Sequence, residues 1–282
     1  MSTVRELLKI TEELLKEGGC DSPSFDALCL LEDIGGVGRG NVPSAATTVL
    51  DEVCCQRVLD AAKRRAAGEP LQYLLGSWDF LTLTLEVGEG VLVPRPETEL
   101  LCEVAAERLR TVKAPVVLDL CAGSGCVGLG VASLCPSSTV TCVEKSPQAF
   151  RYLQNNVKRY PMYAVTPLVG DVLHDHQTFN TQVDALLSNP PYIPQKDLKT
   201  LQREVQHEPA MALDGGEDGL VFYRVIANEW AKHVRSGGFI AVEIGIGQAE
   251  EVARLFAEAG LINIRVYKDF SEIDRVIYAE CV

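Results

Sequence analysis

The stretch LDLCAGSGCVG, from Leu118 to Gly128, joins an apolar run to a turn made of small residues. The apolar run is typical of a buried strand, and the small residues from Cys121 onward are typical of a tight turn that opens a helix. Gly123, Gly125 and Gly128 also satisfy the G-x-G-x-x-G spacing of a nucleotide-binding turn. The sequence therefore predicts a strand, a ligand-binding turn and a helix in succession.

Helical and strand patterns alternate on both sides of this stretch. The expected elements cover residues 97–109 (helix), 115–120 (strand), from 125 (helix), 139–144 (strand), 147–159 (helix), near 168 (strand), 183–188 (strand), 220–234 (helix), 239–244 (strand) and 249–259 (helix). Such alternation predicts a parallel sheet covered by helices on both faces, an α/β fold of the Rossmann-like kind. Residues 262–267 and 275–280 suit an antiparallel hairpin at one edge of that sheet.

The first seventy residues predict a separate, small helical domain. Thr3 and Glu6 have the spacing of a capping box, and the apolar stripe that follows ends at Gly18-Gly19. Two further helical runs cover 25–34 and 48–67, and residues 80–85 alternate with period two, as one strand of a linking hairpin would. We therefore expect a helical substrate-recognition domain at 1–70, a linker with a β-hairpin at 71–96 and a catalytic domain at 97–282.

The bulk composition is that of a globular protein. With 282 residues, of which 47% are hydrophobic, the chain can bury a sizeable core, and no apolar run approaches the ~20 residues of a membrane span. The first residues resemble neither a secretory signal nor a transit peptide, so the cytoplasm is the expected location. The ten cysteines contain no C-x-x-C pair, and His174-Asp175-His176 has no nearby third ligand, so no metal is expected.

The net charge of −13 limits the choice of partners. A protein that binds duplex nucleic acid needs a basic surface that displaces counterions from the phosphates. Extended contact with nucleic acid is therefore disfavoured, although the charge does not exclude a local basic patch.

Asp119 helps to decide between two cofactors for the glycine-rich turn. Read literally, the turn and Glu144 at the end of the next strand fit a dinucleotide, with the acid on the ribose hydroxyls. An acid at Asp119 would repel a pyrophosphate but suits S-adenosylmethionine, which carries an ammonium and a sulfonium. The turn also resembles the D-x-G-x-G-x-G motif of class I methyltransferases, except that Cys121 stands at the first glycine. For both acids the alternative is a simple capping role.

A second motif, SNPPYIP, follows the apolar run that ends at Leu187. Pro190 and Pro191 restrict the backbone, so the side-chain oxygen of Asn189 and the carbonyl of Pro190 are held as two acceptors. A planar NH2 group has two donors to match them, and Tyr192 can stack on the same plane. The motif thus predicts a clamp for a conjugated amine or amide, oriented for methyl transfer, although Asn-Pro-Pro alone can be a simple turn.

Taken together, the sequence resembles the release-factor glutamine N5-methyltransferases over nearly its whole length. The segments that carry the resemblance are GEPLQYLLGSWDF from Gly68, VLVPRPETE from Val91, VVLDLCAGSG from Val116, SNPPYIP from Ser188, EVQHEPAMAL from Glu204, DGGEDGL from Asp214 and GGFIAVEIG from Gly237. NPPY alone is shared with nucleic-acid methyltransferases, whereas the other segments are more specific to this family. Glu144 stands where many members have Asp, and Val172 where some have an aromatic residue.

The resemblance implies roles for particular residues. The cofactor would be S-adenosylmethionine. Its binding site would be lined by Cys121, Ala122, Gly123, Ser124, Gly125, Glu144, Asp171, Val172 and Asn189. Residues Asn189 to Tyr192 would hold the glutamine amide of the Gly-Gly-Gln loop of peptide-chain release factors. Arg95 and Glu97 lie in a family segment near the pocket and are candidate substrate contacts, although Glu97 and Thr98 also suit a helix start after Pro96.

Three functions remain open from the residues: methylation of a protein glutamine, methylation of an exocyclic base amine, and a non-catalytic binding module. The acidic composition disfavours the second, and the intact Asn189-Pro190-Pro191-Tyr192 segment disfavours the third.

Overall fold

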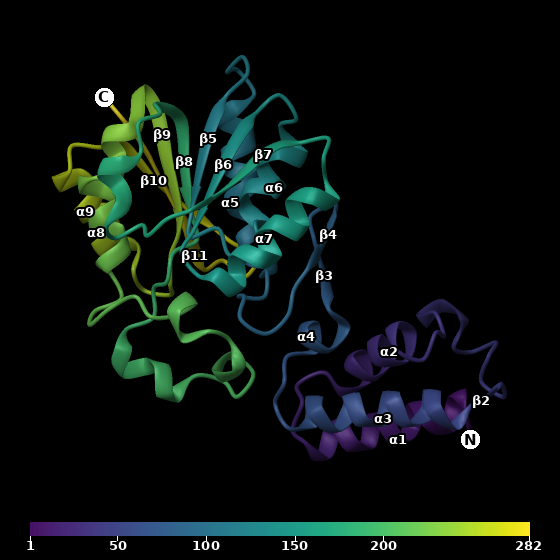
Figure 1. The fold of residues 1–282 in the computed structure, drawn as a ribbon. Coiled ribbons are helices and arrows are strands. Elements are labelled where there is room, and N and C mark those ends of the chain that lie inside the picture. The colour runs from purple at the N-terminus through teal and green to yellow at the C-terminus, as the bar shows by residue number, and fades with distance from the viewer. The chain divides into compact units, whose positions relative to one another are not determined.

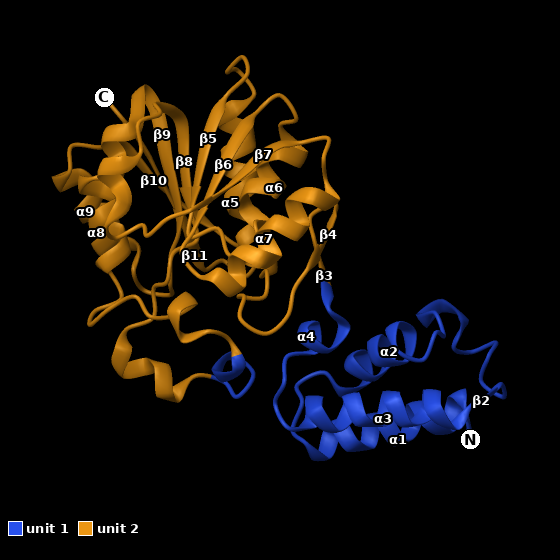
Figure 2. Cartoon of the chain, viewed as in Figure 1, with its two compact units in different colours: residues 1–77, 202–207 blue, residues 78–201, 208–282 orange.

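The structure is a computed structural model that describes residues 1–282. The chain divides into two compact units, shown in different colours in Figure 2. Unit 1 comprises Met1–Ser77 together with Gln202–His207, and unit 2 comprises Trp78–Leu201 and Glu208–Val282. The helical unit thus extends past the expected boundary at residue 70 and includes a segment from much later in the chain.

Unit 1 is built from short helices. Its elements are β1 (Ser2–Thr3), α1 (Val4–Glu17), α2 (Pro23–Asp33), β2 (Val49–Leu50), α3 (Glu52–Ala66) and α4 (Leu71–Leu75). The predicted capping box is confirmed, since the Glu6 amide donates to Thr3 Oγ1 and the Thr3 amide donates to Glu6 Oε2. The predicted start of the third helix at residue 48 is wrong, because Asp51 caps α3 through the Cys54 amide at 2.7 Å.

A buried ion pair lies inside unit 1. The Arg65 guanidinium donates to Asp26 Oδ2 at 2.7 Å and also contacts Glu204 Oε1 at 2.6 Å. Arg65 and Asp26 are each about 5% exposed or less, and burial raises the pKa of Asp26 even though Arg65 opposes the shift. Glu204 is the residue through which the late segment Gln202–His207 joins this pair.

Unit 2 contains a seven-stranded sheet in the order β10-β11-β9-β8-β5-β6-β7. Its strands are β5 (Val116–Leu120), β6 (Thr139–Glu144), β7 (Ala164–Val169), β8 (Val183–Ser188), β9 (Val234–Glu243), β10 (Ile262–Lys268) and β11 (Asp274–Glu280). The strands from β9 to β7 are parallel to one another, whereas β11 is antiparallel to both β9 and β10. The predicted parallel sheet with an antiparallel edge hairpin is confirmed.

Helices cover both faces of this sheet, as Figure 1 shows. They are α5 (Pro96–Leu109), α6 (Cys126–Leu134), α7 (Pro147–Arg159), α8 (Val221–Asn228) and α9 (Ala249–Glu258). Alternate residues of the central strands face opposite cores: in β5, Val117 packs with the core under α5, α6 and α7, and Leu118 packs with the core under α8 and α9. Burial on both faces explains why central strands such as β5 and β8 are rich in apolar residues along their whole length.

Two further predicted elements differ in the structure. The expected strand at 80–85 is two strands, β3 (Ser77–Phe80) and β4 (Leu83–Glu86), because Leu81 has φ 52° and turns the chain between them. The expected helix at 220–234 ends at Asn228 and is followed by a 3-10 turn.

The remaining helical elements are short 3-10 helices. They cover Arg39–Asn41, Asp175–Thr178, Gln195–Thr200, Val205–His207, Ala210–Ala212 and Trp230–His233. No helix has the length and apolar character needed to cross a membrane.

Candidate active site

The order of the central strands reverses between β5 and β8. From β5 the chain proceeds through β6 to β7 on one side, while β8 lies on the other side of β5. Ligands of open α/β sheets bind outside the carboxyl ends of the strands at such a reversal. Here the Ser188 hydroxyl donates to the main-chain oxygen of Leu120 at 2.7 Å, so the two strand ends lie side by side. A cavity of about 410 Å³ opens at this place, within unit 2.

Most of the predicted site residues line this cavity: Arg95, Cys121, Ala122, Gly123, Ser124, Glu144, Asp171, Val172, Asn189 and Pro191. Five predicted residues do not line it: Glu97, Asp119, Gly125, Pro190 and Tyr192. Lining residues that the sequence did not point to include Val91, Val93, Thr98, Lys145, Met211 and Phe222.

The turn after β5 has the unusual backbone that its sequence predicts. Gly123 and Gly125 have φ of 56° and 85°, and Cys121 has φ 60°, although it is not a glycine. This left-handed conformation is the reason for the glycine usually found at the position that Cys121 occupies in the resembling motif. Gly128 allows the close approach of α6, since a Cβ there would lie 2.3 Å from Cys142 Sγ.

Asp119 lies beneath the turn and does not face the cavity. Its side chain is fully buried, and Oδ2 accepts a hydrogen bond from the Gly128 amide at 2.9 Å. Burial raises the pKa of Asp119 to about 7. The position differs from the expected contact with a cofactor ammonium, because the first turn of α6 covers the carboxylate. The capping interpretation describes this geometry better.

Two other acids supply the polar wall of the cavity. Glu144 accepts from the Gly123 amide at 2.8 Å and from the Ser146 amide at 2.6 Å, so it braces the glycine turn and the start of α7 together. Burial raises the pKa of Glu144, in spite of these amides. Burial also disfavours the Asp171 anion, but hydrogen bonds from Lys145 and His174 outweigh it and lower the pKa of Asp171.

The NPPY segment begins directly after β8. Asn189 is partly buried and Pro191 is buried, and both line the cavity. Tyr192 instead turns its hydroxyl toward Glu243 Oε1, at 3.5 Å, and burial raises its pKa. The stacking role expected for Tyr192 is therefore not seen in this geometry.

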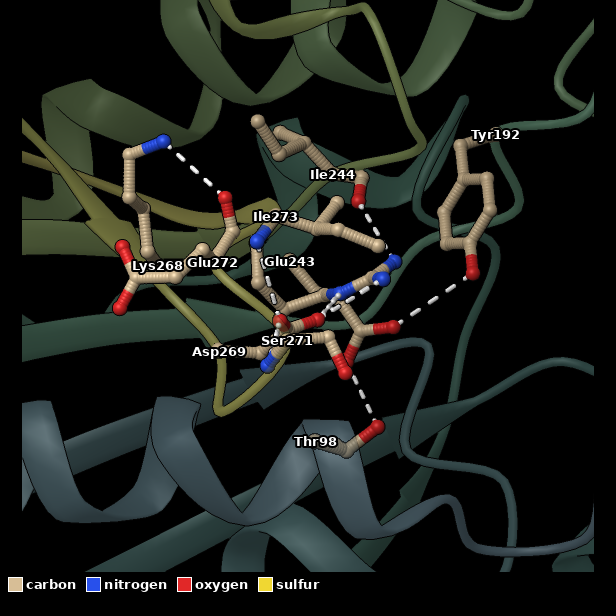
Figure 3. Close-up of polar contacts among 10 residues, drawn as sticks. Thr98, Tyr192, Glu243, Ile244, Lys268, Asp269, Ser271, Glu272 and Ile273 are labelled. Carbon is tan, nitrogen blue, oxygen red and sulfur yellow. Dashed lines mark hydrogen bonds and ion pairs between the residues drawn. The ribbon is translucent and has the colours of Figure 1, made fainter.

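Thr98 and Glu243 are the functional candidates that sequence reasoning missed. The Asn189 side-chain NH2 donates to Thr98 Oγ1 at 3.1 Å, and the Thr98 hydroxyl donates to Glu243 Oε2 at 2.6 Å. Figure 3 shows Thr98 and Tyr192 converging on the Glu243 carboxylate from different elements. The available signal was an acid at the end of the apolar run FIAVE, residues 239–243, which forms the last part of β9.

Arg95 and Glu97 have different surroundings. Arg95 lines the cavity and forms an ion pair with Glu208, whereas Glu97 is exposed on the first turn of α5. Only Arg95 is therefore placed to face a ligand in the cavity.

The comparisons with known proteins agree with this architecture. Residues 96–233 match the family described as "Methyltransferase small domain", and residues 6–76 match the family described as "PrmC N-terminal domain". A 16S rRNA N2 G1207 methyltransferase of Thermus thermophilus has the same fold, with a TM-score of 0.53 at 22% identity, over 73% of this chain and 50% of that one. The fold and the site define a class I methyltransferase.

Relatives at higher identity narrow the assignment. A release factor glutamine methyltransferase of Geobacter sulfurreducens is 38% identical over 98% of this chain and 95% of its own length. One of Moorella thermoacetica is 36% identical over 98% of both chains. The chain belongs to the release factor glutamine methyltransferase family.

Proposed function

We propose that the protein transfers a methyl group from S-adenosylmethionine to the side-chain amide nitrogen, N5, of the glutamine in the Gly-Gly-Gln loop of peptide-chain release factors. The observation that carries this proposal is the position of Asn189, at the carboxyl end of β8 on the wall of the cavity. Because its NH2 donates to Thr98, its carbonyl oxygen is the atom that can accept from a substrate amide.

The residues of the cavity fit S-adenosylmethionine better than a dinucleotide. The acids Glu144 and Asp171 lie on the wall, and Lys145, the cation beside them, is paired with Asp171 at 2.8 Å. Carboxylates accept hydrogen bonds from ribose hydroxyls and attract a cationic ligand, but they repel a pyrophosphate. Val91, Val93, Val143 and Leu173 give the apolar surface that an adenine ring requires.

The residues of the clamp act by orientation. An amide nitrogen is a poor nucleophile because its lone pair is conjugated with the carbonyl. The methyl donor must therefore be held in line with that lone pair. The bound cofactor supplies a methyl group on a positively charged sulfonium. Asn189 accepts one N–H of the glutamine amide, and the two prolines hold Asn189 and the adjacent carbonyl rigid. Pro191, which is buried and lines the cavity, helps to keep water away from the reacting nitrogen.

Release factors are the proposed partners, and unit 1 is the proposed surface for recognising the rest of the substrate protein. The match of residues 6–76 to the N-terminal domain of the same family supports this role. The cytoplasm, where polypeptide release takes place, is the proposed location. A base amine remains the alternative acceptor, because NPPY segments occur in nucleic-acid methyltransferases, but the net charge of −13 disfavours extended contact with nucleic acid.

The test is incubation of the full-length protein with labelled S-adenosylmethionine and one of three acceptors: intact release factor, its Gln→Ala loop variant, and duplex DNA. Label is expected on the loop glutamine of the intact factor alone. Label in DNA, or label that persists on the Gln→Ala variant, would refute the assignment. A parallel calorimetric titration should show binding of S-adenosylhomocysteine and none of NAD.

A further inference from the structure

A buried carboxylate lies behind the substrate clamp. Glu243 is the last residue of β9, is 2% exposed and does not line the cavity. Each of its oxygens receives a hydroxyl group: Oε2 from Thr98 at 2.6 Å and Oε1 from Tyr192 at 3.5 Å. Burying a carboxylate costs free energy of folding, and hydrogen bonds to both of its oxygens offset part of that cost.

The hydroxyl of Thr98 connects Glu243 to Asn189. A hydroxyl has a single proton, and an ionised carboxylate can only accept, so the ionised form of Glu243 commits the Thr98 proton to the bond between them. Thr98 Oγ1 is then left as an acceptor on the side that faces Asn189, where it receives the NH2 at 3.1 Å. Thr98 is 1% exposed, so water does not compete for either bond.

The orientation of the Asn189 amide has a direct chemical consequence. The two ends of an asparagine amide have nearly the same shape, so sterics alone do not select one of them. With the oxygen toward the cavity, Asn189 accepts a substrate N–H; with the NH2 there, two donors would face each other. Selecting one end therefore decides whether the clamp can hold an amide.

Burial and the neighbours of Glu243 act on its charge in opposite directions: burial raises the pKa of Glu243 to about 7, whereas the hydrogen bond from Thr98 and the charge of Arg275 favour the anion. Arg275 on β11 lies close enough to favour the anion, and it is itself held by Asp269 at 3.1 Å and by the main-chain oxygen of Ile244. Figure 3 shows how the loop that carries Asp269 approaches the Glu243 side of the sheet. Tyr223 fixes the backbone of Glu243 by donating to its main-chain oxygen at 2.9 Å.

We propose that Glu243 is a positioning residue which, in its ionised form, accepts the hydrogen bond of the Thr98 hydroxyl and so fixes the Asn189 amide with its oxygen toward the substrate. The inference rests on the proposed function and deepens it. Tyr192 donates to the same carboxylate. Glu243 therefore holds two residues of the NPPY segment, Tyr192 directly and Asn189 through Thr98.

Paired substitutions at Thr98 in the full-length chain test the proposal. Thr98→Val keeps the shape and removes the hydroxyl, and it should lower kcat by about 30-fold or more. Thr98→Ser restores the hydroxyl and should remain within about threefold of the wild-type kcat. Both variants should bind S-adenosylhomocysteine within about twofold of the wild-type affinity, because Glu144 and the glycine turn are unchanged.

Glu243→Gln tests the origin of the effect. A glutamine can donate to Thr98, which frees the threonine proton to point toward Asn189. The loss in kcat should resemble that of Thr98→Val, and the double variant should lose no more than about threefold beyond either single variant. Glu250→Gln, an exposed change of the same chemistry on α9, is the matched control and should leave kcat unchanged.

A measurement without substrate separates this inference from the proposed function. In protein labelled with ¹⁵N-asparagine, the side-chain NH2 of Asn189 should show a hydrogen-bonded proton that Thr98→Val and Glu243→Gln both shift and Thr98→Ser retains. If the wild-type protein does not methylate release factor, the proposed function is refuted. The Asn189 resonance would still show whether the amide is oriented by Thr98 and Glu243. Unchanged resonance and kcat in Thr98→Val, or equal losses in Thr98→Val and Thr98→Ser, would overturn the positioning role.

Discussion

Ser188 and Leu120, the last residues of β8 and β5, are joined by a hydrogen bond of 2.7 Å from the Ser188 hydroxyl to the Leu120 main-chain oxygen. The bond is buried and lies where the glycine turn and the NPPY segment diverge. It fixes the distance between the loop that lines the cofactor side and the loop that carries the substrate clamp.

Ser188→Ala should therefore weaken both stability and alignment. The buried Leu120 oxygen would lose this donor, at a cost of about 1 kcal/mol in the free energy of unfolding. Chemical denaturation measures that cost, and Ser133→Ala, which removes a hydroxyl bonded within α6, is the control. A Ser188→Ala protein as stable as the wild type would show that the bond does not restrain the strand ends.

Asn189→Ala should abolish most turnover and spare the cofactor site. The lost acceptor orients the substrate amide, so we expect the barrier to rise by about 3 kcal/mol or more. The affinity for S-adenosylhomocysteine should change little, since Glu144 and the turn residues are intact. Steady-state kinetics with release factor and a calorimetric titration measure the two effects; a nearly normal kcat would remove Asn189 from the mechanism.

Gly128→Ala should destabilise the protein by about 1–3 kcal/mol, because the new Cβ would meet Cys142 Sγ at 2.3 Å. Removing that sulfur should recover part of the loss, so Gly128→Ala with Cys142→Ala should be more stable than Gly128→Ala alone. Thermal unfolding of both variants provides the comparison. No recovery in the double variant would mean that contact with Asp119, at 3.1 Å from the same Cβ, dominates.

Cys121→Gly and Cys121→Ala separate backbone strain from loss of the sulfur. Both remove Sγ, but only glycine relieves the left-handed conformation at φ 60°. The glycine variant should therefore be more stable than the alanine variant by about 1 kcal/mol. Denaturant titration of the pair decides this, and a less stable glycine variant would mean that the turn tolerates Cys121 without strain.

The stability of the protein should fall between pH 6 and pH 8. Burial raises the pKa of both Asp119 and Glu243 to about 7, above their ordinary values of 3.8 and 4.5. In this range the folded protein binds protons that the unfolded chain has already lost, so stability is present at low pH and is lost as pH rises. Each group contributes a decrease of about 1.4 kcal/mol.

Asp119→Asn isolates one of these contributions. An amide at residue 119 retains an oxygen for the Gly128 amide but does not titrate, so the variant should lose less stability than the wild type on going from pH 6 to pH 8. Denaturation curves at both pH values measure the difference. A variant with the wild-type pH dependence would contradict the assignment to Asp119.

The sequence predicted the sheet and the cavity because both depend on local patterns. Strand β5, the glycine turn and the NPPY segment lie within short stretches, and the rule that parallel strands end at one edge places them together. The Asp119 side chain is buried beneath the turn and does not contact the cavity as expected. Motif spacing says which residue precedes a turn, but not which face of the strand its side chain occupies.

The contacts of Glu243 could not be predicted in the same way. Thr98 and Glu243 are far apart in the chain, and they meet only because α5 packs against the end of β9. Pairings of this kind depend on tertiary packing, which has no period in the sequence. The split of 80–85 into two strands was missed for a related reason, since a leucine at φ 52° breaks the usual preference for glycine.

The inclusion of Gln202–His207 in unit 1 affects the order in which the protein can fold during synthesis. When residue 77 emerges from the ribosome, the helices of unit 1 are present, but of the two acids that pair with Arg65 only Asp26 has been made. Glu204 joins them after β5, β6, β7 and β8 have been translated. Completion of the small N-terminal unit therefore waits for most of the large one, and the nascent chain must carry a partly paired Arg65 until then.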